Sequence, residues 1–325
     1  MVNTLLGPSS RSDTEDGKVT SITNGEMTWM DILDPTPAEM AMLARDYHFH
    51  SLDLDDCLSV RQLTKVEDHG DHLFITLHFP DQVGQEGIVS RQVSMFLGKD
   101  YLVTIHPSSF KTLLTLFQSC RDDEKIRNSF MKSPAYLAYK IIDRSVDGLF
   151  SLLENVQTSL DNIESVVFDE VKSSASAINA ARRQIAILRR ILYPLVLYLP
   201  DLIKAQKFSK EDLTIYFSDI RHKIGKVSAM IEEMKEMVEI YKDTDFVTSS
   251  NRTNTVLSIL TILFTLTIPA TVISSIYGMN IPLPGGLTTG PLEFFGPYTS
   301  MIFIFLAMLV PAVIMALYFK RVGWF

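Results

Sequence analysis

The feature that most constrains this 325-residue chain is a long stretch near its C-terminus that is almost free of charge. Between Arg252 and Lys320, a run of 67 positions, the one charged residue is Glu293. The stretch contains two apolar segments, Thr255–Tyr277 and Tyr298–Phe319, and each is long enough to cross a bilayer core of about 30 Å as a helix. The Gly- and Pro-rich sequence between them does not favour a helix. The chain is therefore predicted to be a membrane protein with a C-terminal hairpin of two transmembrane helices.

The charges that flank the two segments predict their orientation. The connecting loop contains no Lys or Arg, whereas Arg252 precedes the first span and Lys320 and Arg321 follow the second. The positive-inside rule then places both termini on the cytoplasmic side of an inner or plasma membrane and the loop on the outer side. The N-terminus has no apolar signal-peptide core, so residues 1–251 are expected to be cytosolic. A net charge of −8 argues against nucleic acid as a partner and is compatible with cations as ligands.

The cytosolic part is expected to combine an α/β domain with long helices. Thr36, Pro37 and Glu39 have the spacing of a helix N-terminus with a capping box. Strands are expected at residues 27–33, 72–78, 91–97 and 101–106. One long helix is expected to begin at Ser133-Pro134 and run to about residue 171, and a second to begin among residues 173–176.

A third helix is unusually long. From Lys210 to Tyr277 only Gly225 and Pro269 interrupt good helix formers, so a continuous helix would measure about 100 Å. The acidic first two thirds lead into the first span, and such a rod could carry movement of the domain into the membrane. The predicted organisation is a disordered tail at 1–24, a cytosolic α/β domain at 25–130, a helical region and stalk at 131–252 with the long helix at about 209–277, a first transmembrane helix at 253–277, an outer loop at 278–297, a second transmembrane helix at 298–319 and a cytosolic C-terminal tail at 320–325.

Steps of three and four residues along the first span select one stripe on which small polar and apolar side chains alternate. Heptad spacing keeps such a stripe facing a common axis when several copies pack side by side. One interpretation is a pore with apolar constrictions, and the other is ordinary packing and hydrogen bonding between membrane helices. Taken alone, the stripe favours packing, because hydroxyl groups also occur off it. Its members are Asn254, Leu257, Thr261, Phe264, Ile268, Thr271 and Ser275.

The tetrapeptide Tyr277-Gly278-Met279-Asn280, at the outer end of the first span, resembles the signature of the CorA family of divalent-cation channels. The resemblance covers most of the chain, because four further segments match in the order of the family. They are Trp29–Thr36, Tyr216–Asp219, Asn251–Asn254 and Lys320–Trp324.

The resemblance implies a homopentamer whose first spans form the pore, whose second spans form an outer ring and whose long helices form a funnel-shaped stalk. Gly278, Met279 and Asn280 would build the outer ion entrance, with a ring of amide oxygens from Asn280. Neutral oxygens can hold hydrated Mg²⁺ through its water molecules and still release it, as conduction requires. Glu293 would attract cations at the outer loop.

The resemblance also implies regulation from the cytosol. Asp219 matches a position that binds regulatory Mg²⁺ between neighbouring subunits, and Asp81 is the candidate for the partner carboxylate. Bound Mg²⁺ would hold the pore closed, and its loss would restore repulsion and open it. Asn254 aligns with the polar ring at the cytoplasmic end of the pore. Asp243, further down the stalk, fits a cation site and a solvated helix face equally well.

The expected function is a passive Mg²⁺ channel driven by membrane potential, with copies of itself, membrane lipid and divalent cations as partners. Transport of Co²⁺, Ni²⁺ or Zn²⁺, in either direction, is one alternative. A membrane-tethered sensor or scaffold without ion flux is an alternative of another class. The chain is not expected to be an enzyme or to bind nucleotide, because no phosphate-binding Gly-rich loop and no nucleophile elbow occur in it.

Two histidine clusters have spacings that could bind zinc, His48-Phe49-His50 and His69-Gly70-Asp71-His72. They are expected to be surface residues, because no cysteines complete a tetrahedral site. Cys57 and Cys120 are expected to be reduced, structural residues of a cytosolic domain.

Overall fold

The computed structural model describes residues 18–59, 62–84, 87–167, 174–279 and 299–323. The chain divides into two compact units. The first consists of residues 1–167 and 172–242, and the second consists mainly of residues 243–325.

A six-stranded sheet forms the base of the first unit, with strand order β1-β2-β6-β5-β4-β3. The pair of β2 and β6 is parallel, and the other neighbouring pairs are antiparallel. Strands were predicted at residues 27–33 and 101–106 with the observed bounds, whereas those predicted at 72–78 and 91–97 are longer. The strands are β1 (Val19–Asn24), β2 (Met27–Leu33), β3 (Lys65–Asp68), β4 (Leu73–Val83), β5 (Gly87–Leu97) and β6 (Tyr101–His106).

The prediction of a disordered tail at 1–24 is wrong for its last residues, because Val19–Asn24 form the edge strand β1. This strand pairs antiparallel with β2, and its Ile22 is buried. A two-residue loop joins the strands, and its Gly25 has a φ of 61°, which glycine adopts without strain. Glycine at the first of two loop positions is a recognised hairpin signal, so the sequence carried this information. Residues 1–17 lie outside the described part of the chain.

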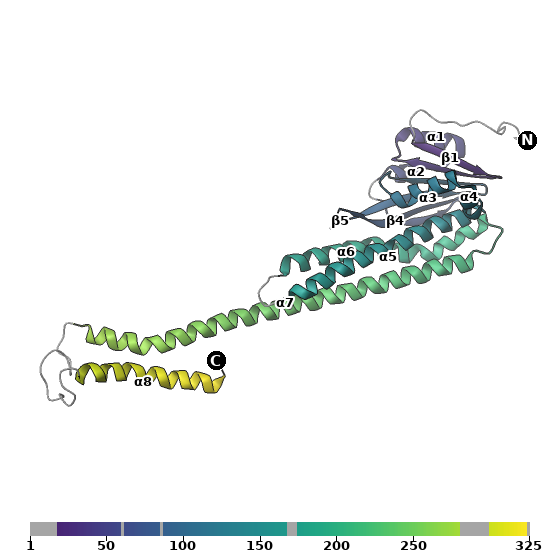
Figure 1. Ribbon diagram of the computed structural model, residues 1–325. Coiled ribbons are helices and arrows are strands. Elements are labelled where there is room, and N and C mark those ends of the chain that lie inside the picture. The colour runs from purple at the N-terminus through teal and green to yellow at the C-terminus, as the bar shows by residue number, and fades with distance from the viewer. Residues whose placement is uncertain (1–17, 60–61, 85–86, 168–173, 280–298, 324–325) are drawn as a thin grey trace, which may run out of the picture. The chain divides into compact units, whose positions relative to one another are not determined.

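Helices cover both faces of the sheet (Figure 1). α1 (Pro37–Tyr47) and α2 (Ser51–Leu58) pack on one face over Phe74, Phe96 and Val103. The larger core lies on the other face, where Leu73, Ile75 and their neighbours meet the remaining helices. Side chains alternate between the two cores along each strand, as the period of two requires. The helices of the larger core are α3 (Lys111–Asp122), α4 (Glu124–Phe130), α5 (Pro134–Val167), α6 (Ala175–Tyr198), the 3₁₀ helix η1 (Leu199–Phe208) and the first part of α7 (Thr214–Tyr277).

Three helix starts agree with the sequence, and one does not. The capping box of α1 is present, with Glu39 Oε2 accepting from the backbone N–H of Thr36 at 2.7 Å. α5 begins at Pro134 and α6 at Ala175, as expected.

The long helix α7 begins at Thr214, so the predicted start at Ser209 is wrong. Side chains tie the intervening residues into a turn. Ser209 Oγ accepts from the N–H of Glu211 at 3.1 Å, and Asp212 Oδ1 accepts from the N–H of Thr214 at 2.9 Å. Gln206 Oε1 accepts from the N–H of Leu213 at 2.6 Å. Ser and Asp side chains compete in this way with the helical backbone.

The second unit contains the rest of α7 and α8 (Thr299–Val322). Both helices are long and apolar enough to cross a membrane. Core helices of soluble proteins can pass the same test, but only 6% of each apolar window is buried here. Within this unit Ile262 and Phe319 are buried, while large apolar side chains such as Phe305 and Leu309 are exposed. Two exposed apolar helices of this length are what the sequence predicted for a membrane hairpin.

Candidate ion-conducting and metal-binding sites

The seven residues of the predicted pore stripe all lie on α7, and all are exposed in the single chain. The exposed fraction is 54% for Leu257, 63% for Phe264 and 56% for Ile268. Ile262, on another side of the same helix, is 6% exposed. The stripe is therefore a surface that the chain does not use for its own packing.

Threonine hydroxyls on this helix donate to its own backbone. Thr261 Oγ1 donates to the carbonyl of Leu257 at 2.7 Å, and Thr271 Oγ1 donates to that of Thr267 at 2.9 Å. The proton is thus used within the helix, and the oxygen keeps lone pairs that can accept hydrogen bonds from water. Thr267, which is off the stripe, bonds to Leu263 in the same way at 2.9 Å. Threonines on and off the stripe therefore form the same backbone hydrogen bond, and only the position of the residue distinguishes those on the stripe.

The signature segment begins where α7 ends. The N–H of Gly278 donates to Ser274 O at 2.9 Å, and the N–H of Met279 donates to Ile276 O at 3.2 Å. A Cβ at position 278 would lie 3.1 Å from Ser274 O, so glycine fits this close approach best. Asn280 and Glu293, the other residues expected at the outer entrance, lie outside the described residues.

Asp219, the expected regulatory ligand, lies on α7 beside a cluster of charges. Its carboxylate is 3.7 Å from Lys223 Nζ, which is also 2.5 Å from Asp143 and 2.8 Å from Asp147 on α5. Burial lowers the pKa of Lys223, but its bonds to Asp143 and Asp147 outweigh burial and leave the pKa above its ordinary value. Asp143 and Asp147 are acidic neighbours of Asp219 that sequence reasoning missed, because they are far from it in sequence.

Asp81, the expected partner carboxylate, lies on β4 and forms an ion pair with Arg91 Nε at 3.1 Å. Among the described contacts no hydrogen bond or ion pair joins Asp81 to Asp219 within the chain. The resemblance implies that Asp219 pairs with a carboxylate of a neighbouring subunit, for which Asp81 is the candidate, so their pairing stays a prediction. Asp243 lies on α7 at the start of the second unit, and its expected role also stays a prediction.

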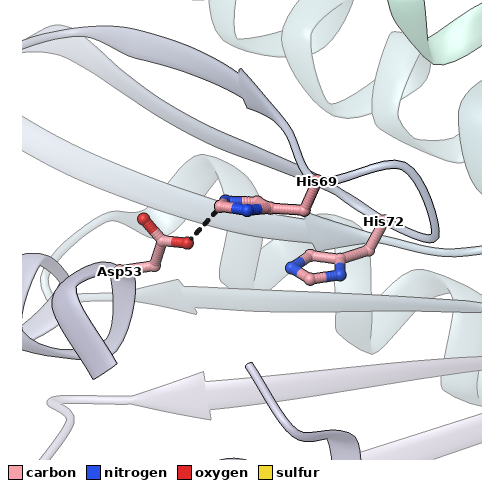
Figure 2. A group of neighbouring side chains, drawn as sticks. All are labelled: Asp53, His69 and His72. Carbon is pink, nitrogen blue, oxygen red and sulfur yellow. Dashed lines mark ion pairs between the residues drawn. The ribbon is translucent and has the colours of Figure 1, made fainter. Parts of the chain in front are cut away.

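The histidines at 69 and 72 were expected at the surface, and for His72 this is wrong, because it is 5% exposed. Ligand atoms of Asp53, His69 and His72 lie within 4.8 Å of one another (Figure 2). Burial raises the pKa of the Asp53 carboxyl. His50 is instead the N-cap of α2, with Nδ1 accepting from the N–H of Leu52 at 3.2 Å. The sequence could not show this cluster, because Asp53 lies on a separate helix.

Comparisons with known proteins decide the family. A model of the CorA-like Mg²⁺ transporter proteins matches residues 24–321. The chain belongs to this CorA-like family. It is 28% identical over 304 residues to the cobalt/magnesium transport protein CorA of Thermotoga maritima, covering 91% of this chain and 83% of that protein.

Solved structures agree with this fold. The complete CorA magnesium transporter of Methanocaldococcus jannaschii matches with a TM-score of 0.75 and 20% identity, covering 94% of each chain. The full-length CmaX protein matches with a TM-score of 0.71 and 17% identity, covering 92% of this chain and 89% of that one. The predicted CorA-like architecture of an α/β domain, a long helix and two C-terminal apolar helices is confirmed. The chain is thus a member of a family of membrane metal-ion transporters.

Proposed function

We propose that this CorA-like protein is a passive Mg²⁺ channel in which several copies, five by the family resemblance, surround a common axis. The observation that carries the proposal is the exposed stripe on α7, found in a chain whose family transports metal ions. The hydroxyl oxygens of Thr261 and Thr271 would accept hydrogen bonds from the water shell of the ion. Leu257, Phe264 and Ile268 would form narrow apolar rings between these polar levels.

The outer entrance is assigned to Gly278, Met279 and Asn280. A ring of amide oxygens from Asn280 would contact the water shell of Mg²⁺, which loses water reluctantly and prefers oxygen ligands. Glu293 would raise the local concentration of cations outside. With the termini in the cytoplasm, a membrane potential that is negative inside drives Mg²⁺ inward, and each charge moved through 100 mV gains about 2.3 kcal/mol.

Gating is assigned to cytosolic Mg²⁺ bound between subunits. Asp219 supports this role, because its carboxylate is exposed and shares the single ammonium of Lys223 with Asp143 and Asp147. Acidic groups gathered at a subunit interface repel one another unless a cation neutralises them. Mg²⁺ binding would favour the closed arrangement by its tighter binding to that state. A carboxylate of the neighbouring subunit, for which Asp81 is the candidate, would complete the site.

The test is Mg²⁺ entry into proteoliposomes that contain a Mg²⁺-sensitive dye, at low internal Mg²⁺ and under a potential that is negative inside. Wild-type protein should admit Mg²⁺, and Asn280→Ala should abolish this entry. Asn162→Ala is the matched control, since it removes an exposed amide from α5 and should leave the flux unchanged. Absence of flux from correctly inserted, oligomeric wild-type protein would overturn the proposal and leave the tethered-sensor alternative.

Transport of Co²⁺ is the second candidate, because the relative from Thermotoga maritima is named a cobalt/magnesium transport protein. The same liposomes with a Co²⁺-quenched dye distinguish the two ions. Co²⁺ entry that Mg²⁺ inhibits, with both fluxes lost in Asn280→Ala, would show one shared path. Ni²⁺ and Zn²⁺ are tested in the same assay.

A further inference from the structure

Asp53, His69 and His72 come from two neighbouring parts of the first unit, helix α2 and the turn between β3 and β4. In this turn the N–H of His69 donates to His72 O at 3.0 Å, which brings the two side chains to the same side. Their rings stack with centroids 4.8 Å apart and 19° between the planes. Figure 2 shows both rings beside the carboxylate of Asp53. His69 Nε2 lies 2.8 Å from Asp53 Oδ2.

Two buried polar atoms in this cluster have no hydrogen-bond partner. His72 Nε2 is one of them, on a side chain that is 7% exposed. Asp53 Oδ2 is the other, on a side chain that is 2% exposed. This oxygen is at ion-pair distance from His69 Nε2, so His72 Nε2 is the one of these two atoms with neither a hydrogen bond nor an ion pair among the described residues. A buried polar atom without a partner costs about 1–3 kcal/mol, so the cluster is better satisfied with a ligand than without one.

The protonation of His72 is suited to binding a metal. Its Nδ1 lies 2.7 Å from Asp71 Oδ1, and a carboxylate can only accept, so Nδ1 carries the proton. In the neutral form of the ring, the unpartnered Nε2 then presents a lone pair. Metal-binding histidines commonly have a carboxylate on the second ring nitrogen, which fixes the tautomer and the orientation of the ring. Asp71 occupies this outer position here.

The charges around the cluster also favour a cation. Asp53, Asp56 and Glu67 share a single ammonium, Lys65 Nζ, at 3.3, 2.6 and 2.9 Å. Lys65 contacts Oδ1 of Asp53, so Oδ2 stays available on the side of the histidines. Asp71 adds a fourth carboxylate on the other side of His72, so four carboxylates and one ammonium carry a formal charge of −3. A divalent ion would reduce this charge to −1.

We propose that Asp53, His69 and His72 form a binding site for a divalent transition-metal ion of the class of Zn²⁺, Co²⁺ and Ni²⁺. Two imidazole nitrogens and one carboxylate oxygen suit these ions, whereas Mg²⁺ prefers oxygen ligands. Ligands on opposite sides of one ion, at about 2.1 Å each, lie about 4.2 Å apart, so the observed 4.8 Å requires only a small movement of one side chain. Three protein ligands leave at least one position for water. The site is in the first unit and does not depend on the proposed channel function.

The experiment is titration of the full-length protein in detergent with Co²⁺, followed by its visible absorption. Excess Mg²⁺ is present throughout to occupy sites made of oxygen atoms. The site should bind one Co²⁺ per chain with the spectrum of nitrogen ligation, and Zn²⁺ should displace it. His69→Ala should weaken binding by at least about 100-fold, and Asp71→Asn, which acts through His72, by about 10- to 100-fold. His69 suits the test because its side chain is 30% exposed, so its removal disturbs the fold least.

His222→Ala is the matched control, because it removes an exposed histidine of α7 and should leave Co²⁺ affinity unchanged. Asp53→Asn is the second ligand variant, since it keeps the shape of the side chain and should also abolish the spectrum. The far-UV circular dichroism of each variant checks that it folds. Absence of the spectrum in folded wild-type protein, or equal affinity in His69→Ala and wild type, would overturn the site. Asn280→Ala should bind Co²⁺ at this site as the wild type does, so the titration tests the metal site independently of the channel proposal.

Discussion

Both parts of helix α7 carry a stripe of residues three and four positions apart, but the stripe is buried in the first part and exposed in the second. In the first part, steps of three and four residues connect side chains that are at most 4% exposed. In the second part, the same steps connect the pore stripe, whose members are all exposed. The buried positions of the first part are Ile220, Ile224, Val227, Ile231, Met234, Val238 and Tyr241.

The difference lies in the partners that the chain itself provides. The first part packs into a core that it shares with α5 and α6, and Tyr241 also donates a hydrogen bond to Glu164 of α5 at 3.2 Å. The stripe of the second part has no comparable cover among the described residues. An amide, hydroxyls and large apolar groups on one face are poorly suited to lipid alone, because polar groups in membrane helices normally face protein or water. The heptad pattern is thus covered within one chain in the first unit, and under the proposed function other copies of the chain cover it in the second.

The largest expected effect is an all-or-none difference in cross-linking between copies. Leu257→Cys places a thiol on the stripe, and Ile259→Cys places one on an exposed position turned about 200° away. Burial raises the pKa of Cys57 to about 12 and that of Cys120 to about 11, so the native thiols should stay unreactive at neutral pH. Mild oxidation in membranes should link copies through Leu257→Cys only. Equal linking at both positions would contradict a common axis.

A substitution in the buried part of α7 should lower the stability of the protein, whereas one on the exposed stripe should not. Ile224→Ala removes a side chain that is 1% exposed and should lower the free energy of unfolding of the first unit by about 2–5 kcal/mol. Phe264→Ala removes a larger side chain from the exposed stripe and should leave this free energy unchanged. Urea unfolding in detergent, followed by far-UV circular dichroism, measures both. A loss of similar size in Phe264→Ala would show that the stripe is packed within the chain.

Local patterns in the sequence predicted most of the fold. The strands at 27–33 and 101–106 and the capping box of α1 depend on neighbouring residues, and they were predicted correctly. The start of α7 was misplaced, because Ser209 and Asp212 resemble cap residues but instead stabilise a turn. β1 was missed, although Gly25, at the first position of the two-residue loop, indicated its hairpin.

The candidate sites were predictable to different degrees. The spacing of the pore stripe is a property of one helix and could be predicted, whereas its exposure depends on what else packs there. The cluster of Asp53, His69 and His72 requires α2 to lie beside the turn between β3 and β4, and this is a tertiary contact. The unpartnered atoms that make the cluster a metal site could be found only in the structure.

A smaller effect is expected from single hydroxyl groups in the membrane part. Thr261 is on the stripe, while Thr267 is six residues further along and turned about 120° away. Both hydroxyls donate to a backbone carbonyl of the helix, so replacement by Val removes the same intrahelical bond from each. Thr261→Val also removes an acceptor that faces the pore and should lower Mg²⁺ flux about tenfold, which is about 1.4 kcal/mol and corresponds to the net loss of about one hydrogen bond to the water shell of the ion. Thr267→Val should change it little. Equal losses would favour the interpretation that these hydroxyls only pack between helices.

The smallest effect concerns a contact that the first unit completes by itself, the capping box of α1. Thr36→Ala should cost about 1 kcal/mol of stability at neutral pH, because it removes the hydroxyl that accepts from the N–H of Ala38 and donates to the Glu39 carboxylate. The hydrogen bonds from Thr36 hold the pKa of Glu39 below its ordinary value of 4.5. A carboxyl with a lowered pKa in the folded state stabilises the protein above its unfolded pKa, and this contribution is lost as the pH falls through the folded value. The difference between wild type and Thr36→Ala should therefore shrink below about pH 4. Thr36→Ser, which keeps the hydroxyl, should retain the pH dependence, and a difference that does not change with pH would show that Glu39 takes no part in the cap.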